Sequence, residues 1–382
     1  MIIDFKLLAT RLATARTLQL TSLDDASAAT GIAPDRLKFI EEASEIPTGD
    51  ELLILANYYA RDFRDFIDSQ RPDPFKETEL LFRGHKDSFS GRDRRAVQEF
   101  LLLCEIEATL ENSLGRNTPP FIFTPTAYLL KDQGPQAALA LRRFFKYEKK
   151  EIKLDVYADF RRLGFHVFRR RLINPDISGL YIEHPIAGHC ILINYDDDIY
   201  RQRFSASHEA AHAIFDSAEA ASVSYQRAST KYPRGDLKEI RANRFASAFL
   251  MPPELLPVNY DWSVTNSLEI AKKLKVSTEA LSYALLEAKL INECDAREIR
   301  SFRVAPADKI DPEAPANLSA LQLVRRKLLL ERGLSDYYVN LCFDAHQNGL
   351  ISAGRLSEAF LSDHNEMKEI SLLYGRNIIS EI

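Results

Sequence analysis

Cysteine is scarce in this sequence and is never paired at short spacing. The 382 residues include four cysteines and no Cys-x-x-Cys motif. The four are Cys104, Cys190, Cys294 and Cys342. Thiols so few and so scattered exclude a disulfide scaffold and a cysteine zinc ribbon, and we expect all four to be reduced.

Long hydrophobic runs and an excess of charge of either sign are also missing. No apolar run approaches the roughly 20 residues of a membrane-spanning helix. The segment Met1–Lys6 lacks the basic and then apolar stretches of a secretory signal. The 50 Lys and Arg residues nearly balance the 55 Asp and Glu residues, which excludes a surface that attracts nucleic acid everywhere. We therefore expect a cytoplasmic globular protein.

The length of the chain and its pattern of apolar residues and prolines predict a mostly helical α+β protein with several domains. At roughly 150 residues per domain, this length suggests two or three units. A long amphipathic helix is expected at 92–114, and β-rich pieces lie at 165–168, 180–182 and 190–193. Proline-rich breaks, among them the candidate linker Arg71–Pro74, separate these regions. We predict a helical bundle at 1–70, a helical connector at 71–134, a unit with a small sheet at 135–300 and a helical region at 301–382.

The first 70 residues have the outline of a helix-turn-helix. A helix beginning near Ser22 ends at Gly31, and Pro34 opens the next helix, where proline is tolerated. Arg36 and Lys38 on that helix are the candidate DNA contacts. However, seven basic side chains in this region face twelve acidic ones, which is unfavourable for binding phosphates. DNA binding therefore stays open here, and the charge balance favours a protein-contact or dimerising module.

The strongest chemical signal is a His-Glu-x-x-His motif formed by His208, Glu209 and His212. On a helix, residues four apart share one face, so both imidazoles can reach a single ion. Glu209 lies one step round the helix, where it can serve as general base for a water activated by that ion. The small and apolar flanking residues predict a buried helix, and buried histidines need partners. These features favour a zinc site over two surface histidines beside an acid.

A catalytic zinc ion needs a third protein ligand and one open position. Glu239 begins a second amphipathic helix 27 residues after His212, and Asn243 lies four residues later on the same face. That helix can offer a carboxylate to the metal and an amide that orients a ligand imidazole. Alone, this pair would more commonly be a solvated helix face. Because the His-Glu-x-x-His motif lies upstream, we expect Glu239 to bind the metal and Asn243 to orient a ligand imidazole.

These motifs resemble the ImmA/IrrE family of metallopeptidases over roughly residues 190–256. The resemblance is carried by Phe204–Phe215, Glu239-x-x-Ala242-Asn243-x-Phe245-Ala246 and Leu250-Met251-Pro252. One departure is Ala211, where many relatives have glycine. The resemblance implies a thermolysin-like (gluzincin) minimal metallopeptidase with one zinc ion per chain held by His208, His212 and Glu239, and with Glu209 as base. Longer relatives also carry an amino-terminal Cro/repressor-type domain, which the first 70 residues resemble.

Two further features bear on substrate binding. Tyr225, Tyr232 and His189 are candidates for stabilising an oxyanion only because they are near the motif in sequence; each is more commonly a core or surface residue. The strand Cys190–Asn194 could hold an extended peptide by strand addition, if it forms an exposed edge of the sheet.

Three functions are compatible with these patterns. The first is a zinc endopeptidase that cleaves a protein regulator; the resemblance implies a transcriptional repressor of phage or stress-response genes as substrate. The second is a DNA-binding regulator whose metallopeptidase fold senses a metal or a partner without cleavage. The third is a component of a toxin–antitoxin or phage-defence pair. A homo-oligomer is compatible with each. The complete motif favours the first function, because a binding fold has no need for Glu209.

Overall fold

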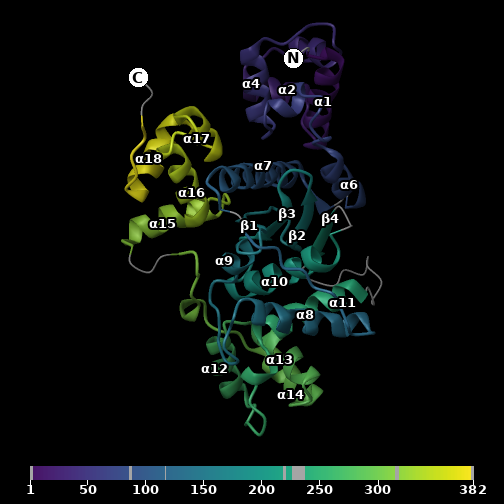
Figure 1. Ribbon diagram of the computed structural model, residues 1–382, viewed down its shortest axis with the longest axis vertical. Coiled ribbons are helices and arrows are strands. Elements are labelled where there is room, and N and C mark those ends of the chain that lie inside the picture. Colours follow the sequence, from purple (N-terminus) through teal and green to yellow (C-terminus); the bar gives the residue numbers. More distant parts are fainter. Residues whose placement is uncertain are drawn as a thin grey trace.

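The computed structural model describes residues 3–85, 88–116, 118–217, 221–225, 237–314 and 318–379. Over these ranges the chain is mostly helical and contains one four-stranded sheet (Figure 1). This architecture confirms the predicted class, a mostly helical α+β fold. None of the described helices is long and apolar enough to cross a bilayer.

Five short helices form the amino-terminal unit at the top of Figure 1. They are α1 (Phe5–Leu18), α2 (Leu23–Thr30), α3 (Pro34–Glu41), α4 (Gly49–Tyr58) and α5 (Arg64–Ile67). Ser22 and Thr48 start α2 and α4 with capping boxes, in which the hydroxyl accepts from a backbone N–H three residues later. Gly31 ends α2 with φ 74°, a conformation that glycine adopts without strain. The apolar faces of these helices close around a core of their own.

The segment predicted as a linker, Arg71–Pro74, is anchored to its surroundings. The Arg71 guanidinium lies 3.2 Å from Asp65 and 3.3 Å from Glu105, so it ties the amino-terminal unit to the next long helix. Two helices follow, α6 (Lys76–Gly84) and α7 (Gly91–Ser113). Helix α7 confirms the long helix predicted from periodicity, and most of its residues are buried because it lies in the centre of the molecule.

The small sheet has four strands in the order β1-β3-β2-β4. They are β1 (His166–Arg170), β2 (Ile177–His184), β3 (Gly188–Asn194) and β4 (Ala221–Tyr225). Strand β3 pairs parallel with β1 and antiparallel with β2, and β4 pairs antiparallel with β2 at one edge. The three expected strands are confirmed, and β4 is additional. Strand addition along Cys190–Asn194 required that strand to be an exposed edge, and this condition is not met, because β3 is paired on both sides.

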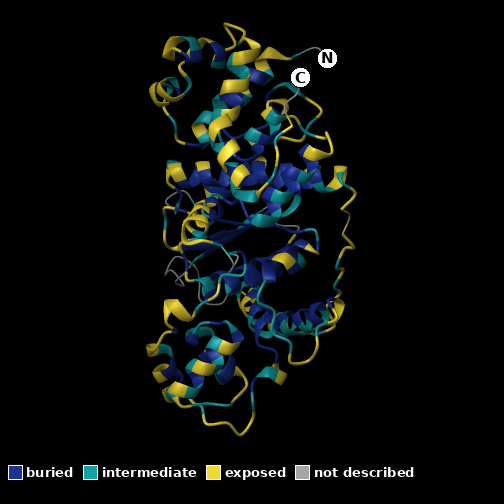
Figure 2. Cartoon of the chain, turned by 90° about the vertical axis from the view of Figure 1, so that its left-hand side faces the viewer, coloured by how far each residue is buried: buried dark blue, intermediate teal, exposed yellow. Residues whose placement is uncertain are grey.

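The sheet separates two hydrophobic cores. On β3, Cys190 and Leu192 face the core that α7 covers, whereas Ile191 and Ile193 face the core covered by α10 (Ile199–Phe215). This alternation follows from the pleat of a strand, which turns successive side chains to opposite faces. The sheet therefore lies between α7 and α10 (Figure 1), and buried residues concentrate in these central layers (Figure 2).

Helix α11 approaches α8 very closely. The helices around α10 are α8 (Leu130–Phe144), α9 (Val156–Arg161) and α11 (Leu237–Leu250). A Cβ on Gly134 of α8 would overlap the carbonyl oxygen of Arg241, so glycine permits the approach. Pro135 has no N–H to give to the carbonyl of Lys131, and Arg244 of α11 donates to that carbonyl at 2.9 Å. Helix α8 therefore continues through Pro135.

Two further groups of helices complete the chain. The first consists of α12 (Val264–Leu274), α13 (Thr278–Glu287) and α14 (Glu293–Ser301). The second consists of α15 (Ala320–Leu330), α16 (Asp336–Gln347), α17 (Ala353–Ala359) and α18 (His364–Tyr374). The first group shares the core of α8–α11, and the second shares the core of α7 on the opposite face of the sheet.

Candidate metal centre

Helix α10 carries the His-Glu-x-x-His motif into the centre of the molecule. Asp198 caps its start by accepting from the N–H of Tyr200. The helix packs its small side chains beneath the sheet, so that His208, Glu209 and His212 are 5%, 0% and 2% exposed. The burial expected from the small flanking residues is therefore present.

Two imidazoles and one carboxylate converge at a single point. Nε2 of His208 lies 3.1 Å from Nε2 of His212. Glu239 lies in the first turn of α11, and its two carboxylate oxygens divide between the nitrogens: Oε2 lies 3.2 Å from Nε2 of His208, and Oε1 lies 3.2 Å from Nε2 of His212. Zinc bonds of 2.0–2.1 Å in tetrahedral geometry would hold ligand atoms about 3.3 Å apart. The spacing of these three side chains therefore fits one zinc-sized ion.

Hydrogen bonds at the far side of each imidazole turn the Nε2 lone pairs toward this point. Nδ1 of His208 lies 3.0 Å from Oδ1 of Asn243, and Nδ1 of His212 lies 3.0 Å from Oδ2 of Asp216. Both oxygens are acceptors, so each Nδ1 carries the proton. Two facing lone pairs would repel unless a cation lies between them. The donor set is the one that holds a divalent metal such as zinc.

Charged neighbours make the same point attractive to a cation. Burial lowers the pKa of His212, but Asp216 and Glu239 raise it, to about 10 overall. Burial alone would raise the pKa of Glu239, and the two histidines hold it well below its ordinary value. The three side chains therefore favour one positive charge between them, either a proton or a metal ion that displaces it.

Asp216 was not predicted from the sequence and proves central to the site. It follows the last residue of α10, and its second oxygen accepts from Nη2 of Arg241 at 2.5 Å. Burial would raise the pKa of Asp216, but His212 and Arg241 hold it below its ordinary value. Arg241 also lies 4.3 Å over the ring of Phe215. The only sequence signal was an acid four residues after the second histidine.

Glu209 lies beside the converging ligand atoms and is completely buried. Neither of its oxygens has a hydrogen-bond partner among the described residues. Burial raises the pKa of this carboxyl, and the neighbouring His208 and His212 partly oppose the rise. A buried carboxylate without a permanent partner is free to take a proton and return it.

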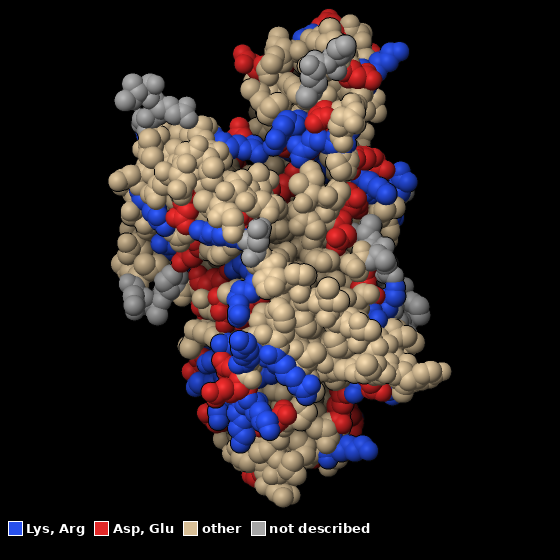
Figure 3. Space-filling model, in the orientation of Figure 1, with Lys and Arg blue, Asp and Glu red and all other residues tan. Residues whose placement is uncertain are grey.

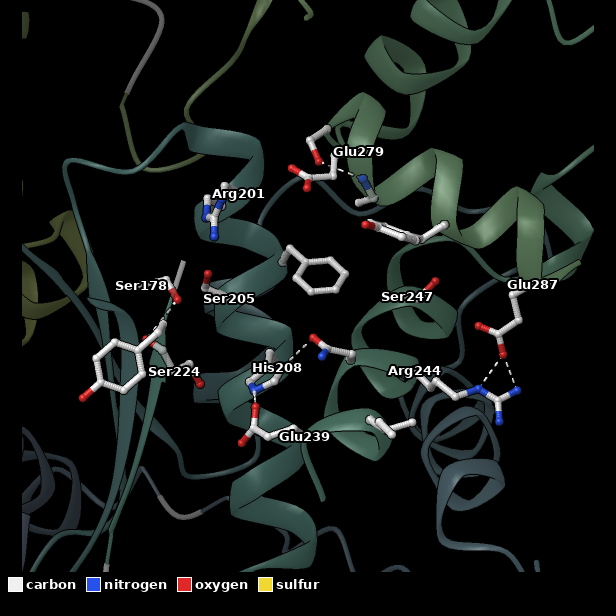
Figure 4. Close-up of a pocket in the computed structure, with 17 residues that line it drawn as sticks. Ser178, Arg201, Ser205, His208, Ser224, Glu239, Arg244, Ser247, Glu279 and Glu287 are labelled. Atoms are coloured by element: carbon white, nitrogen blue, oxygen red, sulfur yellow. Dashed lines mark hydrogen bonds and ion pairs between the residues drawn. The ribbon is translucent and has the colours of Figure 1, made fainter. Parts of the chain in front are cut away.

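A cavity of about 490 Å³ opens next to His208 and Glu239. Residues of α10, α11, α13 and the β2 and β4 strands line it, and Figure 4 shows His208 and Glu239 together at one side. Phe204, one turn before His208, and Tyr283 of α13 supply aromatic surface. The cavity is large enough to hold a short segment of a peptide next to the candidate metal ligands.

Two of the three oxyanion candidates lie in the described ranges, and each of these two contacts side chains other than the candidate metal ligands. Tyr225 lines the cavity, but its hydroxyl lies 2.9 Å from Nδ1 of His85 and donates to Ser88. His189 pairs with Glu183 at 2.7 Å on the sheet. Tyr232 lies outside the described residues.

The candidate DNA contacts are engaged within the amino-terminal unit. Arg36 forms ion pairs with Glu45 and Glu51, and Lys38 lies 3.9 Å from Glu42. On the face shown in Figure 3, blue side chains gather beneath the top unit, and the upper part of that unit carries both blue and red side chains. Neither residue belongs to the metal centre.

Comparison with known proteins places this site in a recognised domain. Residues 160–286 match the model of the Peptidase_M78 family, the IrrE N-terminal-like domain. The matched segment contains the sheet, α10 and α11, and therefore all three converging side chains. The match supports the resemblance to the ImmA/IrrE family and a metallopeptidase-like function. No curated protein and no solved structure matched the chain.

Proposed function

We propose that this chain is a zinc-dependent endopeptidase that cleaves a protein regulator in the cytoplasm. The observation that carries the proposal is the convergence of His208, His212 and Glu239 beside a buried carboxylate that has no partner among the described residues. A site that only binds a metal has no need for such a carboxylate, whereas hydrolysis needs a base.

Each side chain has a distinct part in this proposal. His208, His212 and Glu239 would hold zinc, which when bound polarises a carbonyl and makes water acidic near neutral pH. Glu209 takes a proton from the attacking water and returns it to the leaving amine. Asn243 and Asp216 keep the two imidazoles in the tautomer whose Nε2 lone pair faces the centre.

The cavity and the sheet edge supply a place for an extended peptide. Strand β4 lies at the edge of the sheet, and its residues Ser224 and Tyr225 line the same cavity as His208. A peptide in this cavity would lie along β4, the edge next to the site, rather than along β3, which is interior. Main-chain pairing of this kind gives affinity without demanding one sequence.

The substrate that we propose is a transcriptional repressor of a stress or mobile-element response. The support is the resemblance to relatives that act on such repressors, together with the peptidase-family match. The amino-terminal unit would then contact protein, because its candidate DNA-reading cations pair with its own acids.

The test compares zinc-loaded protein with its Glu209→Gln variant. Each is incubated with a protein extract from the cells that express the chain, and new amino termini are identified by mass spectrometry. We expect cleavage products that need both zinc and Glu209. An identical set of termini from both proteins would contradict the proposed role of Glu209, and the absence of any zinc-dependent product would contradict the peptidase function.

A further inference from the structure

The Glu209 carboxylate rests against the backbone of the sheet at Gly179. A Cβ on Gly179 would lie 3.0 Å from Oε1 and 3.2 Å from Cγ of Glu209, and 3.1 Å from the carbonyl oxygen of Leu192. These separations are tighter than ordinary van der Waals contact. Gly179 is not among the glycines with positive φ, so its backbone does not call for glycine. The missing side chain instead leaves room for the carboxylate.

A bulge in the sheet brings Gly179 to this position. The pairing of β2 with β4 shifts register between Ile177 and Gly179, which leaves Ser178 as the extra residue. The Ser178 hydroxyl donates to the carbonyl of Ser224 at 3.1 Å, and Gly179 then lies opposite Ser224 in the ladder. Bulges commonly re-aim strands beside active sites. This one places a residue without a side chain beside Glu209.

Ser224 contributes a buried hydroxyl to the same place. Its hydroxyl oxygen and both carboxylate oxygens of Glu209 are buried, and none of the three makes a hydrogen bond to another described residue. Ser224 is the ladder partner of Gly179, and directly opposite residues of two paired strands project to the same face of a sheet. Ser222 lies two residues earlier on β4 and also has a buried hydroxyl without a partner there, but it does not line the cavity. Ser222 is therefore a matched control for Ser224.

We propose that Gly179 and Ser224 form a seat for the Glu209 carboxylate, Gly179 by leaving room and Ser224 by offering a hydroxyl donor. Both are positioning residues, because they act through Glu209. The inference rests on the proposed function only in taking Glu209 as the proton acceptor of a zinc site. It predicts that enlarging residue 179 displaces the base while the metal ligands stay in place.

Acetohydroxamic acid tests the seat without knowledge of the substrate. This small zinc ligand gives up its hydroxyl proton when it binds zinc, and Glu209 is the carboxylate placed to take that proton. We expect Gly179→Ala in the zinc-loaded full chain to weaken acetohydroxamate binding about tenfold or more, toward the level of Glu209→Gln, since small misplacements of a reacting group are costly. Zinc content should stay at the wild-type value.

A double-mutant cycle separates a specific seat from general damage to the sheet. Glu209→Asp shortens the side chain and withdraws the carboxylate from residue 179. Gly179→Ala should therefore weaken acetohydroxamate binding much less in the Glu209→Asp background than in the wild type. Gly84→Ala is the control, because a Cβ there meets no atom within 4 Å, and its effect should be the same in both backgrounds.

Each outcome bears on one proposal. Wild-type affinity in Gly179→Ala, or equal effects of Gly179→Ala in both backgrounds, would overturn the seat. If Gly179→Ala does not fold, the serine pair decides: Ser224→Ala should weaken acetohydroxamate binding several-fold and Ser222→Ala should not, whereas equal affinities would overturn the role of Ser224. A wild-type chain that binds no zinc would instead contradict the proposed function.

Discussion

Asp216 accepts from two side chains at once, and in doing so it joins the two helices of the site. One oxygen lies 3.0 Å from Nδ1 of His212 on α10, and the other accepts from Arg241 on α11 at 2.5 Å. The same carboxylate therefore fixes the tautomer of a metal ligand and the position of the helix that carries Glu239. This double use explains why an acid at the end of α10 matters to the centre.

The first prediction follows from this bond. Asp216→Asn keeps the shape of the side chain, but its amide can accept with one atom only and presents an N–H to the other donor. We expect zinc affinity to fall about 10- to 100-fold, as for other groups that orient a ligand histidine. Competition with a fluorescent zinc chelator measures the change. Asp176→Asn, at an exposed loop position, is the control, and an unchanged affinity in Asp216→Asn would contradict the orienting role.

Removal of the metal provides the second prediction. A ligand that binds only the folded chain stabilises it, by about 2.7 kcal/mol at a free concentration 100 times its Kd. Zinc should therefore raise the free energy of unfolding of the chelator-stripped protein, as measured with denaturant. Glu239→Gln should abolish most of this difference. Glu279→Gln, an acid that lines the same cavity but is no candidate ligand, should retain it.

Local spacing made parts of the fold and the site predictable. Helix α7 was predicted closely because its apolar residues recur every three or four positions over its whole length. The pairs His208–His212 and Glu239–Asn243 lie on shared helix faces for the same reason. That the two faces meet depends on the packing of α10 on α11, and the resemblance supplied that step.

The features that escaped prediction depend on contacts between distant segments. Strand β3 is interior because it pairs with the earlier strand β1 as well as with β2, and its own sequence gives no sign of the pairing with β1. In the sequence, Gly179 is an ordinary strand glycine, and only the folded structure shows that Glu209 packs against it. Gly134 likewise has no local signal for its contact with α11. Tertiary packing determines the roles of these positions, and the periodicity of the sequence gives no information about it.

The third prediction concerns Gly134. Gly134→Ala should destabilise the fold by about 1–3 kcal/mol, the usual cost of overpacking, because its Cβ would overlap the Arg241 carbonyl and lie 2.9 Å from the backbone nitrogen of Phe245. Since α11 must then move away, zinc affinity should fall as well. Denaturant unfolding and zinc titration measure the two effects. Gly84→Ala should neither destabilise the fold nor lower zinc affinity. A stable Gly134→Ala variant with full zinc affinity would contradict the close approach of α8 and α11.

The fourth prediction concerns pH and the Arg36–Glu51 pair. Arg36 donates to both oxygens of Glu51, at 2.9 and 2.8 Å, and this bond is the main reason that the pKa of Glu51 falls from 4.5 to about 2. A carboxyl whose pKa is lower in the folded chain stabilises folding fully above its unfolded pKa and loses that contribution as pH falls. The contribution of the pair should therefore disappear between about pH 4.5 and pH 2.

Arg36→Gln tests both the sign of this effect and the engagement of Arg36. Its unfolding temperature should lie slightly below that of the wild type at pH 6, and the difference should narrow as pH falls below 4.5, because Glu51 is then increasingly protonated in the wild type too. High salt should also narrow the difference, since the pair lies at the surface. A difference that is constant over pH and salt would mean that neither Glu51 nor Glu45 holds Arg36. Arg36 would then be available to DNA phosphates, which would favour the regulator function over a protein-contact module.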